Sequence, residues 1–430
     1  MEYYREEAKE ILVKEKVEVL VAGAGPAGVA AAISAARQGA KTMLLEQSGC
    51  VGGVATSGLM SHWTGDTEGG IYEEILQRSG KSDGTREELQ LINPEVLKTE
   101  LLKMLSEAGV ILQLYTFVSG AIMEGSTVTG VITESKSGRE AVMARVVIDA
   151  TGDGDIAARA GVPYHKGREE DGKMQPMTLM FKVGGVDTER AVFPKGFEET
   201  FELPKGDLQT LGREHLKAPA GHVLLYPSTM PGVVTCNMTN CIEVDGTKAE
   251  ELTTAEVTCR GQLDGIVRFL KEFVPGFENC YLISSASMIG VRETRHFAGE
   301  YTLTEEDILS ARVFEDWAVT RAHFNFDVHG LAGPGLDETG SQKKFTQKKG
   351  YTIPYRCFVP KKVDGLLLAG RDISGTHLAH SNYRVMPICA NMGQAVGIAA
   401  SMSAKQNVKP RDINVKDLQQ ILTGLGGEVK

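Results

Sequence analysis

A glycine-rich turn between a short apolar segment and a run of small residues constrains this chain more than any other feature. Val17–Val21 (VEVLV) is mainly apolar and predicts a buried parallel strand. Three glycines follow in the spacing G-x-G-x-x-G, at Gly23, Gly25 and Gly28. The first permits a tight turn, the second lets a diphosphate approach the backbone, and the third lets helix and strand pack closely. The pattern predicts a βαβ unit that binds a dinucleotide.

The residues beyond the turn complete this unit. A helix of small residues begins at Pro26 and Ala27, and its free N–H groups suit a diphosphate. A second strand, Lys41–Leu45, ends at Glu46, which lies 21 positions after Gly25, where an acid normally holds the ribose of an ADP group. Gln47 follows directly and is included in the predicted site. A glycine turn without a ligand is the alternative, but the complete unit argues against it.

The next segment distinguishes FAD from NAD. A plain NAD-binding domain would continue into further βα units, whereas this chain enters an irregular stretch rich in Gly, Ser and Thr. The stretch resembles the one that wraps the rest of FAD in many flavoproteins with two dinucleotide-binding domains. Its predicted FAD contacts are Gly52, Gly53, Val54, Ala55 and Thr56.

The remainder of the first 161 residues predicts a β-meander beside the dinucleotide unit. A helix is expected from Asn93 to about Ala108. The short strands expected after it are Val110–Leu114, Phe117–Met123, Val128–Thr133, Glu140–Met143 and Arg145–Ala150. Thr151 and Gly152 follow the last strand, and an Ala-Thr-Gly ending of this kind is usual beside the adenine end of FAD in flavoproteins.

The C-terminal part returns to the same body. Gly365–Ala369 predicts a strand that leads into Gly370 and Asp372, and this segment resembles a second FAD fingerprint whose Asp binds the ribityl chain. A helix of small residues then begins near Met386 and includes Met392 and Gly393. Its N–H groups could face the flavin N1/C2=O edge; simple core packing of small residues is the alternative.

Five segments together resemble the FAD-dependent oxidoreductase family of the glutathione-reductase type. They are GAGPAG, GGVATSG, DATGDGD, GVRETRH and the segment Leu368–Ala400. Distant relatives in this class are the fumarate reductase/succinate dehydrogenase flavoprotein and the FAD subunit of heterodisulfide reductase. The resemblance implies FAD as cofactor and a Rossmann-like α/β fold, but it specifies the reaction poorly.

The middle of the chain predicts an inserted domain. We expect the FAD-binding domain at residues 1–161 and 350–430, with an α+β substrate or cap domain at 162–349. Strands are expected there at Met177–Val183, His222–Tyr226, Gly232–Cys241 and Tyr281–Ile289, and a long helix at Thr254–Phe273.

Three residues are the catalytic candidates. His380 lies between the second fingerprint and the last predicted helix, in a loop expected to pass the flavin, and is the candidate acid/base. Arg384 in the same loop and Arg292 in the motif GVRETRH are candidate binders of a carboxylate, phosphate or oxyanion. A structural ion pair between Arg292 and Glu293, and a hydrogen-bonded core role for the histidine, are the alternatives.

Composition limits the partners. The net charge of −10 argues against nucleic acid, no apolar run is long enough for a membrane span, and the seven scattered cysteines indicate reduced thiols in a cytoplasm. Cys236 and Cys241 are expected to be structural, and no metal site is predicted. The leading hypothesis is hydride transfer between a small substrate, suited by the two arginines to carry an anionic group, and the flavin, with an external electron acceptor or donor. An NAD(P)H-dependent flavin monooxygenase and a non-catalytic FAD electron carrier are the alternatives, and a homo-oligomer is left open.

Overall fold

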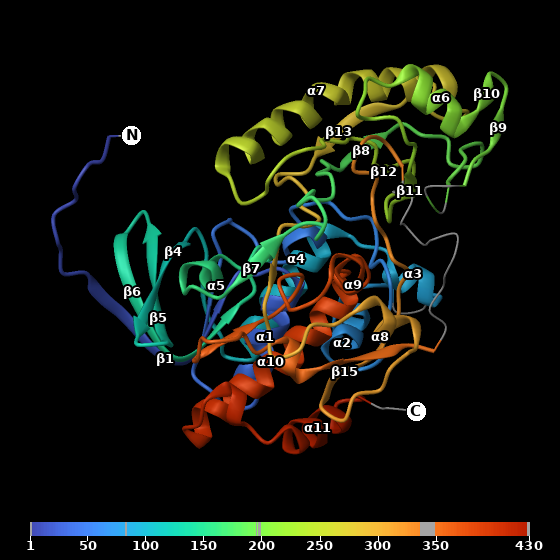
Figure 1. Cartoon of the computed structure of the whole chain (residues 1–430). Coiled ribbons are helices and arrows are strands. Elements are labelled where there is room, and N and C mark those ends of the chain that lie inside the picture. The colour runs from blue at the N-terminus through green and yellow to red at the C-terminus, as the bar shows by residue number, and fades with distance from the viewer. Residues whose placement is uncertain (1, 82–83, 195, 197–198, 336–348, 428–430) are drawn as a thin grey trace.

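The computed structural model describes residues 2–81, 84–194, 196, 199–335 and 349–427. These residues form a body built on a seven-stranded mixed sheet and a cap built on a four-stranded antiparallel sheet. The cap lies across one side of the body, with its long helix α7 outermost (Figure 1). The arrangement confirms the predicted α/β class, with a parallel sheet, a meander and a smaller α+β unit.

Strand β6 is the centre of the body sheet, because it pairs with three other strands. One edge pairs with β1, and the other edge pairs with both β5 and β17. The strand order is β3 (Ile111–Gln113), β2 (Thr42–Leu45), β1 (Leu12–Ala22), β6 (Gly138–Asp149), β5 (Thr127–Ser135) and β4 (Phe117–Glu124). The first half of β6 pairs with β5 in the antiparallel meander, and its end pairs in parallel with β17 (Leu366–Leu368). β17 therefore brings the C-terminal fingerprint beside the end of β6, on the opposite side of β6 from β1.

Most helices surround this sheet. They are α1 (Pro26–Arg37), α2 (Gly70–Ser79), α3 (Arg86–Gln90), α4 (Pro94–Glu107), α5 (Asp155–Arg159), α8 (Glu305–Leu309), α9 (His377–Tyr383), α10 (Met386–Gln406) and α11 (Val415–Gly424), with short 3₁₀ turns η1 (Gly53–Ala55), η2 (Tyr355–Cys357) and η3 (Pro410–Asp412). α10 is buried along nearly its whole length and packs along α1. The two helices that flank the predicted FAD site are thus in direct contact.

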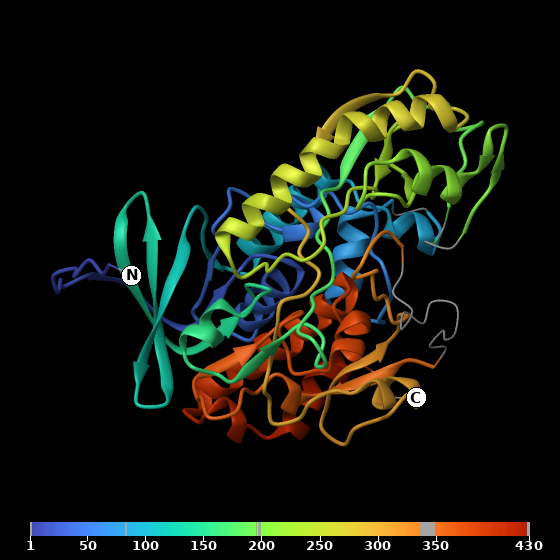
Figure 2. The same ribbon diagram turned by 45° about the horizontal axis from the view of Figure 1, so that its top comes forward.

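The cap sheet has the order β11 (Leu225–Pro227), β12 (Val234–Cys236), β8 (Phe181–Gly184) and β13 (Tyr281–Ser285). α7 (Ala249–Phe273) and α6 (Leu208–His215) pack with it, and the small hairpin of β9 (Glu202–Leu203) and β10 (Gly206–Asp207) lies at one end (Figure 2). The buried apolar side chains of the cap form a hydrophobic cluster of their own, separate from the core of the body.

Two short two-stranded sheets extend the body. β7 (Tyr164–Lys166) pairs with β14 (Arg295–Phe297), and β15 (Trp317–Ala322) pairs with β16 (Tyr351–Pro354). The cap cluster runs from Met177 to Ile289, whereas Phe297 and the buried residues around β15 belong to the core of the body. The predicted domain limits of 162 and 349 are wider than this cluster and stay a prediction.

Several predicted elements differ in extent. Glu140–Met143 and Arg145–Ala150 were expected as two strands but form the single strand β6, because nothing turns the chain at Ala144. The expected strand Gly232–Cys241 is only β12, because the Thr239 hydroxyl bonds both backbone groups of Leu179 and leads the chain away. Cys241 lies outside β12, and all seven cysteines are free, with Cys236 and Cys241 buried.

Two predictions about the C-terminal part were wrong. The segment with His377 and His380 was expected as a loop but forms helix α9, which Thr376 caps by accepting a hydrogen bond from the Ala379 N–H. The helix that begins at Met386 is not the last, because α11 follows it. Across the described ranges, no single helix is long and apolar enough to span a bilayer; α9 and α10 meet the length and composition only as a pair bent by 92°.

Candidate active site

The glycine turn has the geometry that a diphosphate requires. A Cβ on Gly23 would lie 2.4 Å from the Ala150 carbonyl oxygen, and one on Gly28 would lie 1.8 Å from the Gly23 oxygen. A Cβ on Gly25 would meet no atom within 4 Å. Two of the glycines are therefore needed for close packing, and the middle one leaves open space at the start of α1, where Pro26 and Ala27 begin the helix.

Glu46 is held in place by the same turn. Its Oε2 accepts a hydrogen bond of 2.7 Å from the Ala24 N–H, and its Oε1 accepts one of 2.7 Å from the Ser48 N–H. These bonds fix a carboxylate beside the turn, where a ribose hydroxyl can donate to its remaining lone pairs. Gln47 is exposed beside it.

The predicted wrapping segment lies against the turn. The Gly52 N–H donates to the Ala24 oxygen at 2.7 Å, and a Cβ on Gly53 would lie 3.0 Å from the Cα of Gly25. Val54 and Ala55 continue the 3₁₀ turn η1, after which the Thr56 hydroxyl donates to the Val51 oxygen at 2.6 Å. The structure thus brings the first two groups of predicted FAD residues together.

Asp372 provides the clearest test of whether FAD fits. Its side chain is fully buried, and neither carboxylate oxygen has a hydrogen-bond partner in the described part of the chain. Burial, reinforced by Asp149, raises the pKa of this carboxyl well above its usual range. A buried carboxylate without a donor is costly, and a ribityl hydroxyl would satisfy it. The site therefore fits the predicted group.

The neighbours of Asp372 place it beside α1. Gly370 has φ +115°, and a Cβ on it would lie 3.4 Å from the Ala27 Cβ. Thr151 donates its hydroxyl to Asp149 at 2.7 Å, and Gly152 leaves room for the guanidinium of Arg371. These fingerprint residues meet at the ends of β6 and β17.

Met392 and Gly393 lie deeper than the sequence suggested. Met392 is fully buried, and a Cβ on Gly393 would lie 2.0 Å from the Ala27 oxygen. The close crossing of α10 and α1 is therefore sufficient to explain why a glycine is needed at position 393. This is the core-packing role that was the alternative to flavin binding. Their role in binding FAD stays a prediction.

The two candidate arginines occupy one buried polar cluster, which we call the arginine cluster: His222, Tyr226, Arg292, Asp327, His329 and Arg384. The Arg384 Nη2 donates to Asp327 Oδ2 at 3.0 Å, and His329 lies 3.3 Å from the same oxygen. Arg292 donates to the Pro176 oxygen at 2.5 Å. Burial and the nearby Arg384 lower the pKa of Arg292 to about 10, so it remains positive at neutral pH.

His380 belongs to a second cluster, the histidine cluster: Glu293, His296, His377 and His380. Glu293 Oε1 lies 2.8 Å from His296 Nε2 and 2.6 Å from His377 Nδ1. The ring of His380 lies edge-on to His296, with 4.8 Å between centroids. The ion pair between Arg292 and Glu293, which was the alternative to anion binding, is not formed, because Glu293 is bound by histidines instead.

Gln175 connects the two clusters. Its N–H donates to Glu293 Oε2 at 3.0 Å, while its side-chain oxygen accepts from the His329 N–H at 3.2 Å. Sequence reasoning missed Gln175, Asp327, His329, His222 and Tyr226 as site residues. No motif marks them, and they meet only because the cap and body fold together.

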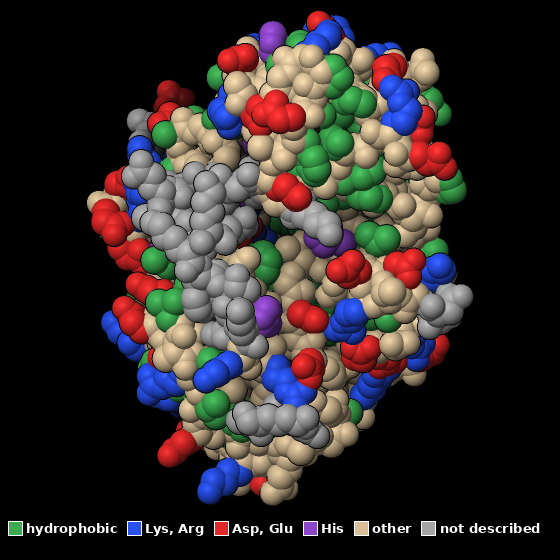
Figure 3. Space-filling view, turned by 90° about the vertical axis from the view of Figure 1, so that its right-hand side faces the viewer, with side chains coloured by type: hydrophobic (Ala, Val, Ile, Leu, Met, Phe, Trp, Pro, Cys, Tyr) green, Lys and Arg blue, Asp and Glu red, His purple; other side chains and the backbone are tan. Residues whose placement is uncertain are grey.

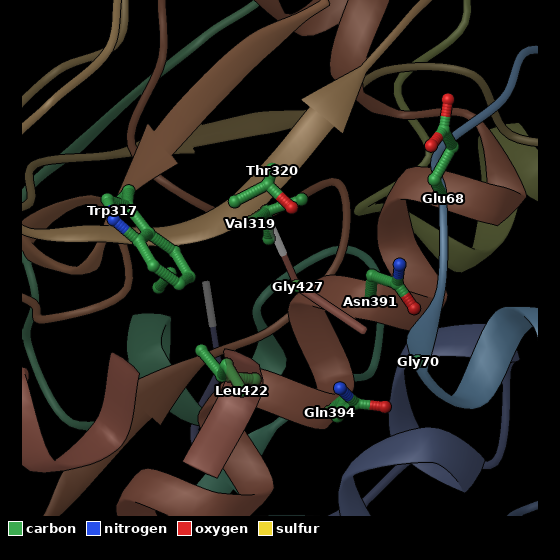
Figure 4. A pocket seen from close by; sticks show the side chains of 10 residues that line it. Glu68, Gly70, Trp317, Val319, Thr320, Asn391, Gln394, Leu422 and Gly427 are labelled. Carbon is green, nitrogen blue, oxygen red and sulfur yellow. The ribbon is translucent and has the colours of Figure 1, made fainter. Parts of the chain in front are cut away.

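In Figure 3, histidine and charged side chains lie around a recess between the cap and the body. A separate pocket between β15, α10 and α11 is lined by Glu68, Gly70, Trp317, Ala318, Val319, Thr320, Asn391, Gln394, Leu422 and Gly427 (Figure 4). Asn391 and Gln394 there bond backbone groups of residues 69–72, so they serve the start of α2.

Comparisons with known proteins support FAD as the cofactor. The sequence model of the family described as "FAD dependent oxidoreductase" matches residues 18–422. A digeranylgeranylglycerophospholipid reductase of Methanocella arvoryzae is 29% identical over 33% of this chain and 40% of its own length. Another, from Methanococcoides burtonii, is 26% identical over 45% and 53%. The matches thus span about half the length of these curated relatives or less.

Solved structures show the same fold. A geranylgeranyl bacteriochlorophyll reductase-like protein from Thermoplasma acidophilum covers 95% of this chain and 84% of its own, with a TM-score of 0.51 at 15% identity. A triple mutant of the flavin-dependent brominase Bmp2 covers 94% and 83%, with a TM-score of 0.50 at 14% identity. Since the family match extends over nearly the whole chain, the protein belongs to the FAD dependent oxidoreductase family, and FAD is its cofactor.

Proposed function

We propose that this enzyme transfers a hydride between FAD and a small substrate that carries a carboxylate or similar anionic group. The observation that carries the proposal is that, among the described residues, the arginine cluster holds two guanidinium groups and one carboxylate. Arg292 and Arg384 are both buried or nearly so, and Asp327 is the carboxylate paired with Arg384. Burial lowers the pKa of His329 to about 4 and of His222 to about 3, so both rings are neutral at neutral pH.

The roles of the arginines follow from their partners. Arg384 is anchored by Asp327, which leaves it oriented but largely neutralised. Arg292 bonds a backbone carbonyl, and its charge is not matched by an ion pair among the described residues. A buried guanidinium favours an incoming anion, because desolvation strengthens the attraction. We therefore assign carboxylate binding to Arg292 and its support to Arg384.

FAD and the aromatic rings near the arginine cluster have the remaining roles in the proposed reaction. FAD supplies the group that accepts or donates the hydride, and the chain orients the substrate against it. Tyr226 is a neutral phenol, since burial raises its pKa, and its ring lies 5.0 Å from that of His62. These rings would exclude water from one side of the substrate. Proton transfer by His380, an external electron acceptor and a cytoplasmic location stay predictions.

Arg292 offers a direct test. Anaerobic FAD-loaded enzyme should be mixed with small hydroxy and amino acids and with their uncharged amides, and prereduced enzyme with unsaturated acids, while the visible flavin absorbance is followed. Arg292→Met should raise the KM of the active acid by about 10- to 100-fold with a smaller change in kcat, because a charged hydrogen bond contributes about 1.5–3 kcal/mol. Arg292→Lys should recover part of the loss.

Arg356→Met is the matched control, because Arg356 makes an exposed ion pair with Asp316. It should leave KM unchanged. An amide that reacts as well as its acid, or an Arg292→Met enzyme with wild-type KM, would contradict the proposal. Rapid reduction by NADPH with oxygen consumption would instead support a monooxygenase.

A further inference from the structure

We propose that Glu293, His296 and His380 form a binding site for a divalent transition-metal ion. Each of the three side chains offers one ligand atom, and these atoms all lie within 4.8 Å of one another. All three residues are 1% exposed, so the site lies inside the protein. None of the three is a predicted FAD contact or a member of the arginine cluster, to which Gln175 connects them.

The chemistry of the three ligands defines the class of ion. Two imidazoles and one carboxylate suit Zn²⁺ or Fe²⁺, whereas Mg²⁺ and Ca²⁺ prefer oxygen ligands alone. Three protein ligands leave at least one coordination position for water or a small molecule. Ligand atoms around a tetrahedral Zn²⁺ lie about 3.4 Å apart, so ion binding would require small adjustments of the side chains within the 4.8 Å that the three ligand atoms now span.

Unpartnered nitrogen atoms are the second, independent observation. His296 Nδ1, His377 Nε2 and His380 Nδ1 are buried and have no hydrogen-bond partner in the ranges that the structure describes. The His380 side chain makes no hydrogen bond to these residues, although its ring is buried against His296 and Tyr383. Buried imidazole nitrogens normally bond a partner, and an ion would give His380 one.

The surrounding residues resemble an outer shell around such a site. His377 holds Glu293 Oε1 at 2.6 Å, and the Gln175 N–H holds Oε2 at 3.0 Å. Bonds of this kind orient a carboxylate ligand. The exposed Glu169 accepts a hydrogen bond from the His377 N–H at 3.2 Å and adds negative charge nearby.

The ligands come from distant parts of the chain. Glu293 precedes β14, His296 lies in β14, and His380 lies in α9. An ion would therefore tie the segment that leaves the cap to the C-terminal part of the body. In this proposal His380 is a ligand, which replaces the acid/base role expected from the sequence.

The test uses the FAD-loaded enzyme. Protein stripped with a chelator should be titrated with Zn²⁺ by calorimetry, and the metal bound per FAD should be measured by elemental analysis. We expect one Zn²⁺ per chain in the wild type. His380→Gln should weaken this binding by at least about 100-fold, because loss of even an outer-shell partner costs about 10- to 100-fold in affinity.

His329→Gln is the matched control, since His329 is a buried histidine of the neighbouring cluster, and it should keep the wild-type stoichiometry. The FAD content of each variant reports whether it has folded. A second readout needs no variant: Zn²⁺ should raise the unfolding temperature of the wild type. Absence of stoichiometric Zn²⁺ uptake by the wild type, or equal uptake by His380→Gln, would overturn the proposal.

Discussion

Three buried carboxylates in this protein differ in what surrounds them. Asp149 accepts hydrogen bonds from the Thr151 N–H and hydroxyl and from the Ile156 and Ala157 N–H groups. Glu293 is bound by two histidines and one backbone N–H. Asp372 is equally buried but has no partner among the described residues. At the residue scale, the carboxylate that lacks a partner in the protein is the one expected to meet the cofactor.

Replacing Asp372 should separate FAD affinity from the stability of the protein without FAD. Asp372→Leu should weaken FAD binding by about 10- to 100-fold, the loss of a charged hydrogen bond of about 1.5–3 kcal/mol. The apoprotein should become no less stable, since an unpartnered buried carboxylate is removed. Fluorescence titration with FAD and urea unfolding of the apoprotein measure the two effects.

Asp149→Asn is the comparison variant, because Asp149 has its partners within the chain. It should lower the stability of both forms. A large loss of apoprotein stability in Asp372→Leu would mean that its carboxylate is held by the protein itself.

At the element scale, the contact between α1 and α10 depends on glycines that face backbone. A Cβ on Gly393 would lie 2.0 Å from the Ala27 oxygen, and one on Gly397 would lie 2.2 Å from the Ala31 oxygen. The glycines Gly261 and Gly265 in α7 are different, because a Cβ on either would meet no atom within 4 Å. A glycine-to-alanine substitution should therefore lower the free energy of unfolding in α10 and raise it in α7.

Gly397→Ala should destabilise the protein by about 1–3 kcal/mol or more, because the added methyl group cannot fit without moving a helix. Gly261→Ala should stabilise it by about 0.5–1 kcal/mol through the lower entropy of the unfolded chain. Equilibrium unfolding in urea measures both. Equal effects of the two substitutions would show that α1 and α10 do not cross as closely as described.

At the scale of the whole molecule, the arginine cluster lies where segments of the cap meet segments of the body, which have separate hydrophobic cores. His222 and Tyr226 come from the cap, Arg292 comes from the segment between β13 and β14, and Arg384 comes from the end of α9. The arginine cluster contains buried histidines that are neutral in the folded protein. In the unfolded chain these imidazole rings bind protons more readily, so folding opposes their protonation. The stability of the fold is thereby linked to pH.

Acid should weaken the protein because of these histidines. The folded pKa of His329 is about 4 and that of His222 about 3, both below the ordinary 6.5, so the unfolded chain binds protons that the folded chain excludes. The free energy of unfolding is therefore unaffected by these histidines above about pH 6.5. It decreases as the pH drops from 6.5 toward the folded pKa values, by up to about 3 kcal/mol for His329.

His329→Gln should make this fall smaller, because glutamine takes up no proton in either state. Urea unfolding at about pH 7.5 and about pH 5 measures the difference. His215→Gln, at an exposed position on α6, should leave the fall unchanged. A wild-type protein equally stable at both pH values would contradict the neutral state of the buried histidines.

The sequence by itself determined the cofactor and the class of fold. The strand, glycine turn, helix, second strand and Glu46 lie within one short unit, and their contacts are local, so spacing alone reveals them. Asp372 was expected as the acid of a second FAD fingerprint because it lies shortly after the apolar strand β17, and its contact with FAD stays a prediction. Features of this kind can be predicted from the sequence because the residues that form them are close together in the chain.

Only the tertiary structure decided which polar side chains meet between the cap and the body. Arg292, Asp327 and Arg384 lie far apart in the chain, and no periodicity links them. The binding of Glu293 by histidines rather than by Arg292 likewise depends on a contact between α9 and the segment before β14. The physical reason is that burial and long-range packing, not local propensity, set the partners of these groups.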